Sequence, residues 1–275
     1  MSREEQWLLP EGVEELLPDR AAVIERLRRR LLDLYARWGY ELVFPPLIEY
    51  LESLLNGGGR DLERQTFKIT DQMTGRLMGV RADITPQVAR MDAHSLRRPG
   101  PSRLCYCSSA LRTHAGQPDG SRIPYQVGVE LFGHGGLESD EEVVSLLLET
   151  LAVADVGGVT LDLGHVGLYR SLIAAAGLDA EAEAELEDIY RRKSAADLDA
   201  FLDGSNLSTD VRNALARLPW LAGPPAVLRE ARAQLSAFGE PVTAALDQLE
   251  TLTERLTTQY PAVNLHLDLG ELRGY

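Results

Sequence analysis

The sequence predicts an α+β fold, in which short strands of an antiparallel sheet are flanked by helices and a segment of short helices follows. Three observations lead to this prediction. Apolar and polar residues alternate in a hairpin pattern over residues 103–133. Apolar residues recur at helical spacing in residues 19–38, and residues 139–153 also form a helical pattern. Between residues 178 and 260, Ala, Glu, Leu and Arg dominate, and Gly and Pro interrupt them at intervals that indicate several short helices.

The composition is that of an ordinary globular protein and argues against two classes of function. The net charge of −14 over 275 residues disfavours broad electrostatic binding to nucleic acid, which needs clustered Lys and Arg. No apolar run reaches the roughly 18 residues of a membrane-spanning helix, and the N-terminus has no signal-peptide core. We therefore expect a cytoplasmic protein that binds neither membrane nor tRNA.

Cysteine and histidine usage gives no sign of a disulfide or a metal site. Cys105 and Cys107 lie two apart on one expected strand, so both point to the same face and are expected to stay reduced. The five His residues show no metal-ligand spacing. We expect no metal and no cofactor.

The N-terminal third is expected to hold a helix, a strand and a hairpin. Asp19 is a candidate N-cap for the first helix, which ends at Gly39. Residues 40–49 form a strand that runs into the double proline at 45–46, which stops further pairing. Residues 66–71 and 77–81 then form a hairpin that turns at Thr74 and Gly75.

A helix is expected to begin near Asp83, Thr85 and Pro86, with Thr85 as N-cap and Pro86 in the first turn. Two interpretations remain open for Asp83 and Thr85. They cap the helix and do nothing else, or their side chains also bind a ligand.

The hairpin of residues 103–133 carries a candidate binding wall. Its strands are expected over 104–111 and 125–132, with a long polar loop between them. Arg112, Gln126 and Glu130 would lie on one face. A carboxylate binds an ammonium, and Arg or Gln binds a carboxylate or carbonyl, so this wall suits a small zwitterion.

The C-terminal half is expected to hold a helix over 139–153, a strand over 159–163 and a last strand over 263–270. A lone His165 after a strand is more often structural than catalytic. Residues 178–260 are expected to form a segment of short helices, and the family resemblance described below implies that this segment is inserted into one domain of residues 1–177 and 261–275.

These residues resemble a known family. The Gln126–Gly133 segment is similar to motif 2 of class II aminoacyl-tRNA synthetases, in the version of histidyl-tRNA synthetase. Those enzymes have Arg, any residue, then an ATP-binding Glu, whereas His114 stands at that place here. With His114 and the sequence Arg-Ala-Asp-Ile-Thr-Pro-Gln at residues 81–87, the chain resembles the regulatory subunits of short-form ATP phosphoribosyltransferase.

The resemblance implies the fold, a ligand and the positions that hold the ligand. Residues 40–49 resemble motif 1, which forms a homodimer interface in the family. Asp83 replaces a Glu that holds the histidine amino group in the synthetase, and the sequence stops just after the matching Arg273, before motif 3. The histidine-binding residues implied in this way are Asp83, Thr85, Arg112, Gln126, Glu130 and Arg273.

The function implied is that of a non-catalytic regulatory subunit in histidine biosynthesis. Its partner would be the short catalytic phosphoribosyltransferase subunit, and histidine would act as feedback inhibitor. The first alternative is the catalytic fragment of a histidine–tRNA ligase, and the second is a paralogue that forms another acyl-adenylate. Both need residues that clamp ATP, and His114 argues against both. Histidine could bind in this pocket or at the junction with the partner, and both possibilities remain open.

Overall fold

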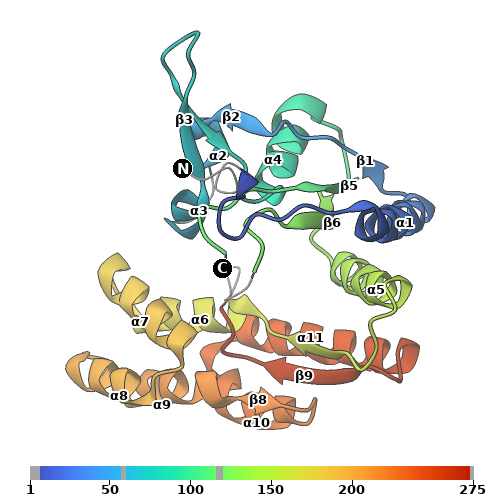
Figure 1. The fold of residues 1–275 in the computed structure, drawn as a ribbon. Helices are drawn as coiled ribbons and strands as arrows, with labels where there is room; N and C mark the ends of the chain where they lie inside the picture. Colours follow the sequence, from blue (N-terminus) through green and yellow to red (C-terminus); the bar gives the residue numbers. More distant parts are fainter. Residues whose placement is uncertain (1–6, 57–59, 116–119, 273–275) are drawn as a thin grey trace. The chain divides into compact units, whose positions relative to one another are not determined.

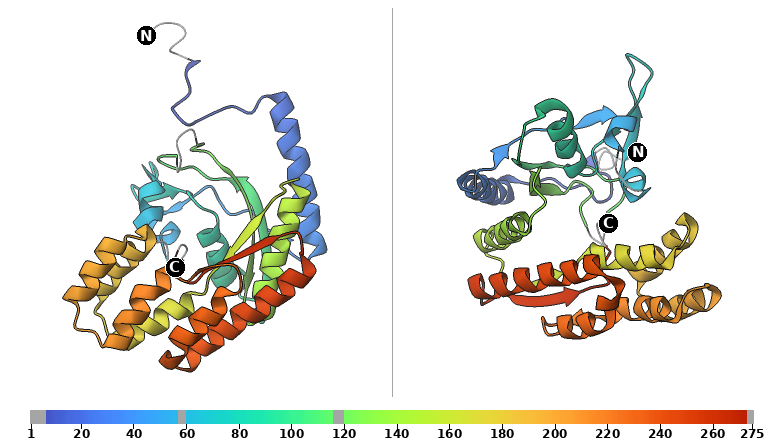
Figure 2. Two further views of the ribbon diagram at one scale, coloured as in Figure 1. Left: turned by 90° about the horizontal axis from the view of Figure 1, so that it is seen from below. Right: turned by 180° about the vertical axis from the view of Figure 1, so that it is seen from behind.

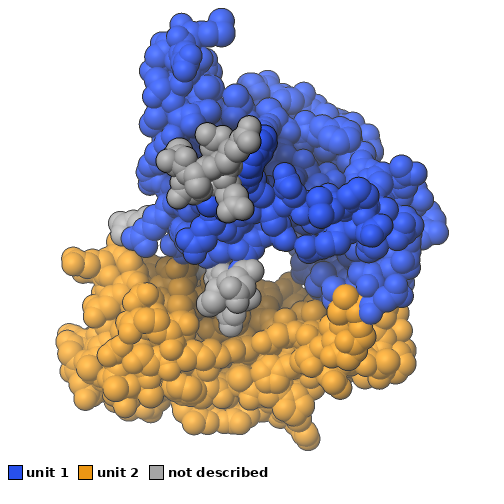
Figure 3. All heavy atoms as spheres, viewed as in Figure 1, with its two compact units in different colours: residues 1–155 blue, residues 156–275 orange. Residues whose placement is uncertain are grey.

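A computed structural model describes residues 7–56, 60–115 and 120–272. Figure 1 shows an α+β fold of short strands and many helices, as predicted. Its contacts divide the chain into two compact units, residues 1–155 and residues 156–275 (Figure 3). Each unit is described by itself below.

The central sheet of the first unit is built on the predicted hairpin. Strands β5 (Ser102–Ser109) and β6 (Tyr125–Phe132) pair antiparallel along their whole length. Strand β1 (Glu41–Leu42) pairs with the other edge of β5, but in parallel. The sheet is therefore mixed, because the chain passes through a second small sheet before it returns as β5.

Helices cover both faces of this sheet. Helices α1 (Pro18–Arg37) and α5 (Leu137–Val153) pack on one face, where Cys105, Val127 and Val129 meet the apolar stripe of α1. Helix α4 (Thr85–Arg90) lies against the other face, and Ile84 and Val88 pack there with Leu104 and Tyr106. The alternation of side chains along β5 and β6 thus separates an apolar core from a partly polar one.

The second sheet of this unit is antiparallel, with strand order β2-β4-β3. Strand β2 is Ile48–Tyr50, and β3 (Phe67–Thr70) and β4 (Leu77–Val80) form the predicted hairpin, which projects in Figure 1. Gly75 takes a φ of 73°, and Asp71 accepts a hydrogen bond from the Thr74 hydroxyl at 2.6 Å. The short helices α2 (Leu51–Leu54) and α3 (Arg60–Gln65) connect β2 to β3, and a π-helical turn over Met91–Leu96 continues α4 before β5.

Two expected helix caps are wrong. Helix α1 begins one residue before Asp19, because the carbonyl of Leu17 already accepts a hydrogen bond from Ala21 at 2.9 Å. Asp19 is a first-turn residue there, which suits the helix dipole. Helix α4 likewise begins at Thr85 with Ile84 as its N-cap, so the Thr85 hydroxyl does not cap the helix.

The second unit is a mainly helical body with one small sheet. Strands β7 (Thr160–Leu163) and β9 (Asn264–Asp268) pair in parallel, and β8 (Ala222–Gly223) adds an antiparallel edge. Helix α6 is Val166–Ala176, and the long helix α11 (Glu240–Gln259) lies beside it (Figure 2). The other helices are α7 (Ala180–Arg192), α8 (Ala195–Gly204), α9 (Thr209–Arg217) and α10 (Val227–Leu235). Short 3₁₀ turns lie at Leu218–Trp220 and Ser236–Phe238.

The sequence specifies where these helices begin. Side-chain oxygens of Asp179, Ser194 and Ser208 accept hydrogen bonds from backbone N–H groups at the starts of α7, α8 and α9. Their apolar faces meet in one large core. The strands that flank residues 178–260 pair with each other, which is how an insertion would be held. The compact units divide the chain at residue 155, so the domain boundaries at 177 and 261 remain a prediction.

Three further observations concern the described residues. Cys105 and Cys107 are free thiols on the buried face of β5, and burial raises the pKa of the Cys105 thiol to about 11. No described helix has the length and apolar character needed to cross a bilayer. Across the described ranges, no cluster of three or more His, Cys, Asp or Glu side chains could hold a metal ion.

Candidate functional site

The register of β5 and β6 brings the predicted wall onto one face. Gln126 lies opposite Ser108, and Glu130 lies opposite Leu104. Between them Tyr106 lies opposite Gly128. Residues two apart on a strand share a face, so Gln126, Glu130 and Tyr106 all lie on the side where α4 packs.

Tyr106 occupies the centre of this wall, and sequence reasoning missed it. A Cβ atom on Gly128 would stand 2.5 Å from the Tyr106 hydroxyl oxygen, so only glycine leaves room for the ring. The ring is buried and packs in the core cluster of Ile84, Val88 and Leu104. A Tyr facing a Gly across the hairpin was the one signal in the sequence that could have found it.

Hydrogen bonds join four side chains from three segments into one network. The Gln126 amide donates from Nε2 to Asp83 Oδ1 at 2.8 Å and to the Tyr106 hydroxyl at 3.4 Å. The Tyr106 and Thr85 hydroxyl oxygens lie 3.1 Å apart, and the Thr85 backbone N–H donates to Asp83 Oδ1 at 3.2 Å. The network fixes which way the Gln126 amide faces, because its NH₂ group must point at Asp83.

The other end of that amide has no partner within the described residues. Gln126 Oε1 is buried and accepts no hydrogen bond there. A buried amide oxygen left unpaired costs free energy on the order of 1–3 kcal/mol. An N–H or ammonium group from a ligand would remove that cost, so this oxygen marks a place where a donor is missing.

The Glu130 carboxylate beside the network has a raised pKa. Burial raises the pKa of Glu130, and the charge on Asp83 raises it further, while hydrogen bonds from Thr85 and Tyr106 work in the opposite direction. Burial also raises the pKa of Tyr106 to about 12, so this phenol remains a donor at neutral pH. A cation bound at this face would offset the cost of keeping Glu130 ionised.

Arg112 follows the end of β5, and its side chain contacts the backbone next to Asp83. Its backbone bridges Thr66, and its Nε donates to the carbonyl of Ala82 at 3.3 Å, next to Asp83 in sequence. In the described part of the chain, no carboxylate pairs with this guanidinium. Its terminal nitrogens thus remain able to bind an acid.

Arg81 holds together the segments that carry the site through buried hydrogen bonds, and the sequence did not indicate this role. The residue is 4% exposed and its guanidinium donates to the carbonyls of Ser109 and Pro45, both at 2.8 Å, and to the Ser108 hydroxyl at 2.5 Å. Burial lowers its pKa. These bonds tie the strand end before Arg112 to the segment that carries Asp83.

The remaining predicted residues fall elsewhere. His114 is exposed, and its ring lies 3.0 Å from the Thr113 hydroxyl. His165 acts structurally: its Nδ1 accepts the Gly167 N–H at the start of α6, and its Nε2 lies 2.9 Å from Gln248 Oε1. Arg273 lies outside the described residues. The structure therefore gathers Asp83, Thr85, Gln126 and Glu130 directly and brings Arg112 to the neighbouring backbone.

Comparison with known proteins places this chain in a family. The Histidyl-tRNA synthetase family model matches residues 12–275. The ATP phosphoribosyltransferase regulatory subunit of Thioalkalivibrio sulfidiphilus is 56% identical over 275 residues, which cover 100% of this chain and 70% of that protein. The protein of the same name from Chromohalobacter salexigens is 52% identical, with the same coverage of both chains.

A solved structure agrees. The crystal structure of an ATP phosphoribosyltransferase regulatory subunit/histidyl-tRNA synthetase from Bacillus halodurans C superimposes with a TM-score of 0.83. It is 28% identical, and the match covers 99% of this chain and 70% of that one. With its synthetase-like fold, this chain belongs to the histidyl-tRNA synthetase-like family and, within it, to the ATP phosphoribosyltransferase regulatory subunits.

Proposed function

We propose that this chain acts as the histidine-sensing, non-catalytic part of an ATP phosphoribosyltransferase, needed for the first step of histidine biosynthesis. Its relatives are named regulatory subunits, and a regulatory subunit acts through a catalytic one. The partner is a short-form catalytic phosphoribosyltransferase subunit. Histidine regulates the complex if it binds two states of the assembly unequally.

The observation that carries the proposal is the unpaired Gln126 oxygen beside two carboxylates. Asp83 and Glu130 suit an ammonium group, and Gln126 Oε1 accepts a further N–H. Arg112 suits the ligand's own carboxylate. An amino acid with an extra N–H donor satisfies all of these groups together, and histidine is such an amino acid. Thr85 and Arg273 complete the proposed set.

The chain does not activate histidine with ATP under this proposal. His114 stands where the synthetase pattern has an ATP-binding Glu, and its ring lies beside Thr113. An imidazole does not replace a carboxylate in holding a nucleotide or its metal ion. Histidine-dependent exchange of pyrophosphate into ATP tests this point, because appreciable exchange by the full-length protein would support a histidine–tRNA ligase instead.

A homodimer through the motif 1-like segment is also proposed. Four apolar side chains of residues 42–48 are between 40% and 69% exposed in the single chain: Leu42, Phe44, Leu47 and Ile48. An exposed apolar group of this kind is common where two copies meet. Sedimentation of Phe44→Glu beside the unaltered protein tests this interface, and an unchanged dimer in the variant would rule it out.

The decisive experiment replaces Glu130. The Glu130→Ala protein, mixed with the catalytic subunit, should still assemble and activate it. The histidine concentration for half-maximal inhibition should rise at least tenfold, because the ammonium loses a partly buried carboxylate. Asp140→Ala removes an exposed carboxylate from the first turn of α5 and serves as the matched control. Inhibition that is unchanged in Glu130→Ala would contradict the proposed site.

A further inference from the structure

Residues 10–13, named the N-terminal turn here, form a tight turn ahead of α1. The Val13 N–H donates to the carbonyl of Pro10 at 3.0 Å, and Gly12 takes a φ of 72°. A Cβ atom on Gly12 would stand 2.9 Å from Cγ of Arg122, so a larger residue would collide with that arginine. The N-terminal turn therefore leaves room for the Arg122 side chain to lie against it.

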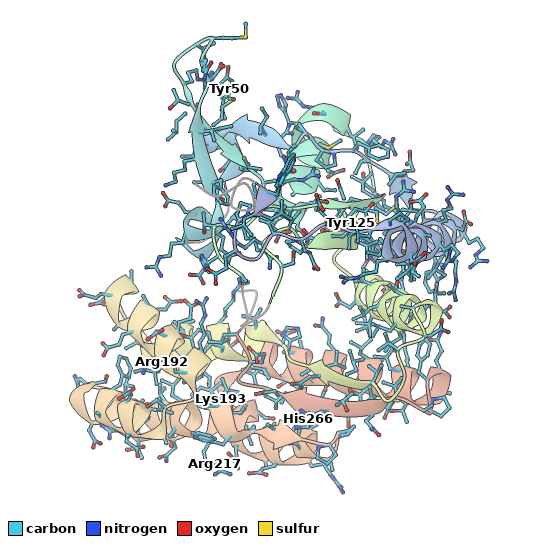
Figure 4. The ribbon with its side chains drawn as sticks, in the orientation of Figure 1. Tyr50, Tyr125, Arg192, Lys193, Arg217 and His266 are labelled. Atoms are coloured by element: carbon cyan, nitrogen blue, oxygen red, sulfur yellow. The ribbon has the colours of Figure 1, made fainter. Side chains whose placement is uncertain are left out.

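The backbone of Arg122 joins the N-terminal turn to the central hairpin. Arg122 lies three residues before Tyr125, the first residue of β6, which Figure 4 labels. Its N–H donates to the carbonyl of Gly12 at 2.7 Å, and its carbonyl accepts the N–H of Arg112 at 2.8 Å. The backbone of Arg122 thus lies between the N-terminal turn and the residue that is proposed to bind the ligand's carboxylate.

The side chain of Arg122 contacts the same two segments again. Its Nε donates to the carbonyl of Arg112, and its Nη1 donates to the carbonyl of Glu11, both at 3.2 Å. The guanidinium carbon lies 5.2 Å from the centroid of the Phe67 ring, which is a cation–π contact. Among the described residues no carboxylate pairs with this guanidinium. Its planar group serves two backbone carbonyls and a ring, which the point charge of a lysine does not reproduce.

One residue therefore holds both backbone polar groups of Arg112. In a regular antiparallel pair, two facing residues exchange both of their N–H···O bonds. Here the Arg122 N–H donates to Gly12 instead, and the Arg122 Nε takes its place at the Arg112 carbonyl. The direction of the Arg112 backbone thus depends on the side chain of Arg122, and that side chain is held by the N-terminal turn.

We propose that Arg122 is a positioning residue, which directs the Arg112 guanidinium toward the carboxylate of the bound amino acid. The inference rests on the proposed function, in which Arg112 binds that carboxylate. Arg122 acts by holding the backbone of Arg112, whose Nε is fixed at the carbonyl of Ala82. Loss of Arg122 should remove the part of the binding that depends on the carboxylate. The part that depends on the ammonium, at Asp83 and Glu130, should remain.

Two ligands separate these parts in the full-length protein. Histidine and histidinol, in which a hydroxymethyl group replaces the carboxylate, are titrated by calorimetry. Arg122→Met should weaken histidine binding about tenfold and histidinol binding less than twofold, because only histidine carries the group that Arg112 binds. A general loss of packing would weaken both ligands alike. Arg97→Met is the matched control, since Arg97 is exposed and donates to the carbonyl of His94 at 2.8 Å, and it should change neither affinity.

Two further variants distinguish positioning from charge. Arg122→Lys keeps the positive charge but not the planar group, so it should lower the preference for histidine over histidinol at least threefold. Full preference in Arg122→Lys would mean that charge alone attracts the carboxylate, and would overturn the inference. Arg112→Met should show the same selective loss, and Arg112→Met/Arg122→Met should lose no more than Arg112→Met alone. Additive losses would mean that Arg122 acts independently of Arg112, against the inference.

The same titrations separate this inference from the proposed function. If Glu130→Ala weakens both ligands, but Arg122→Met weakens them equally or not at all, the pocket is supported and the role of Arg122 is wrong. If Glu130→Ala weakens neither ligand, the proposed site itself fails. If Arg122→Met does not fold, Gly12→Ala tests the same contact, because its methyl group displaces the Arg122 side chain. An unchanged preference for histidine in Gly12→Ala would then overturn the inference.

Discussion

The two compact units differ in what they bury. The second unit buries one large apolar cluster, in which Leu186, Leu215 and Leu246 are 0% exposed. The ion pairs of Arg192 and Arg217 in this unit lie on its surface. The first unit divides its apolar side chains between two small clusters and buries polar groups beside them, among them Arg81 and Gln87.

This difference indicates which kind of interaction stabilises each unit. An apolar core gains free energy from each buried side chain. A buried polar wall gains little from folding and is worth most when a ligand completes it. The unpaired oxygen of Gln126 belongs to the second kind, so the first unit is expected to be stabilised by its ligand more than the second.

The largest effect is expected in the apolar core. Leu246→Ala, in α11, leaves a cavity at a fully buried position and should lower the free energy of unfolding by about 2–5 kcal/mol. Leu147→Ala makes the same change at a side chain that is 47% exposed and should cost less than about 0.5 kcal/mol. Urea unfolding followed by circular dichroism measures both. A small loss of unfolding free energy in Leu246→Ala would contradict this comparison, since it would mean that the second unit is loosely packed.

An intermediate effect is expected at the wall. Gly128→Ala places a methyl group 2.5 Å from the Tyr106 hydroxyl oxygen, so the ring must shift and the network with Thr85 and Gln126 must open. Unfolding free energy should fall by about 1–3 kcal/mol. Histidine affinity, measured by calorimetry, should fall at least tenfold.

Gly135→Ala is the control for that variant, because a Cβ atom there meets no atom within 4 Å. It should leave both stability and histidine affinity unchanged. Normal affinity in Gly128→Ala would show that Tyr106 does not organise the binding face.

The smallest expected effect is a change of the free energy of unfolding with pH. Burial raises the pKa of Glu130 in the folded chain, so the native state holds its proton more tightly than the unfolded state. Stability should therefore fall as pH rises from about 4.3, the ordinary value for Glu, through the raised native pKa. Glu130→Gln should remove this fall. Histidine affinity of the unaltered protein should rise over the same window, because the ammonium needs an ionised partner.

Glu142, in the same unit, is expected to give the opposite dependence of stability on pH. Hydrogen bonds from Arg103 lower its pKa, so its contribution to stability is present above the ordinary value for Glu and is lost as pH falls through the lowered one. Unfolding measured between pH 3 and 7 in Glu130→Gln and Glu142→Gln separates the two. Slopes of equal sign would contradict the difference in burial.

The sequence predicted that Gln126 and Glu130 share a face because side chains along a strand alternate between the two faces of a hairpin. Alternation along residues 125–132 sets the face of Gln126 and Glu130, and the register then follows from the pairing of β5 with β6. The projecting hairpin of β3 and β4 follows from Thr74 and Gly75 in the same way. These features depend on neighbours in sequence.

Features that depend on distant segments were missed or misjudged. Thr85 was expected to cap a helix, but its hydroxyl lies beside Tyr106, a residue of strand β5. Arg81 was not singled out, because its three acceptors come from residues 45, 108 and 109. Local propensity does not carry such contacts, which exist only once the sheet has formed.

The pairing of β7 with β9 has a consequence for the order in which the protein folds. Thr160 and Asn264 are partners, so the sheet of the second unit can close only after all the helices between them have left the ribosome. Among the described residues of this core, Leu267, Leu269 and Leu272 are the last to be synthesised. Until they arrive, the helices expose the apolar faces that these leucines cover, and a nascent chain at that stage is open to proteases and to its neighbours.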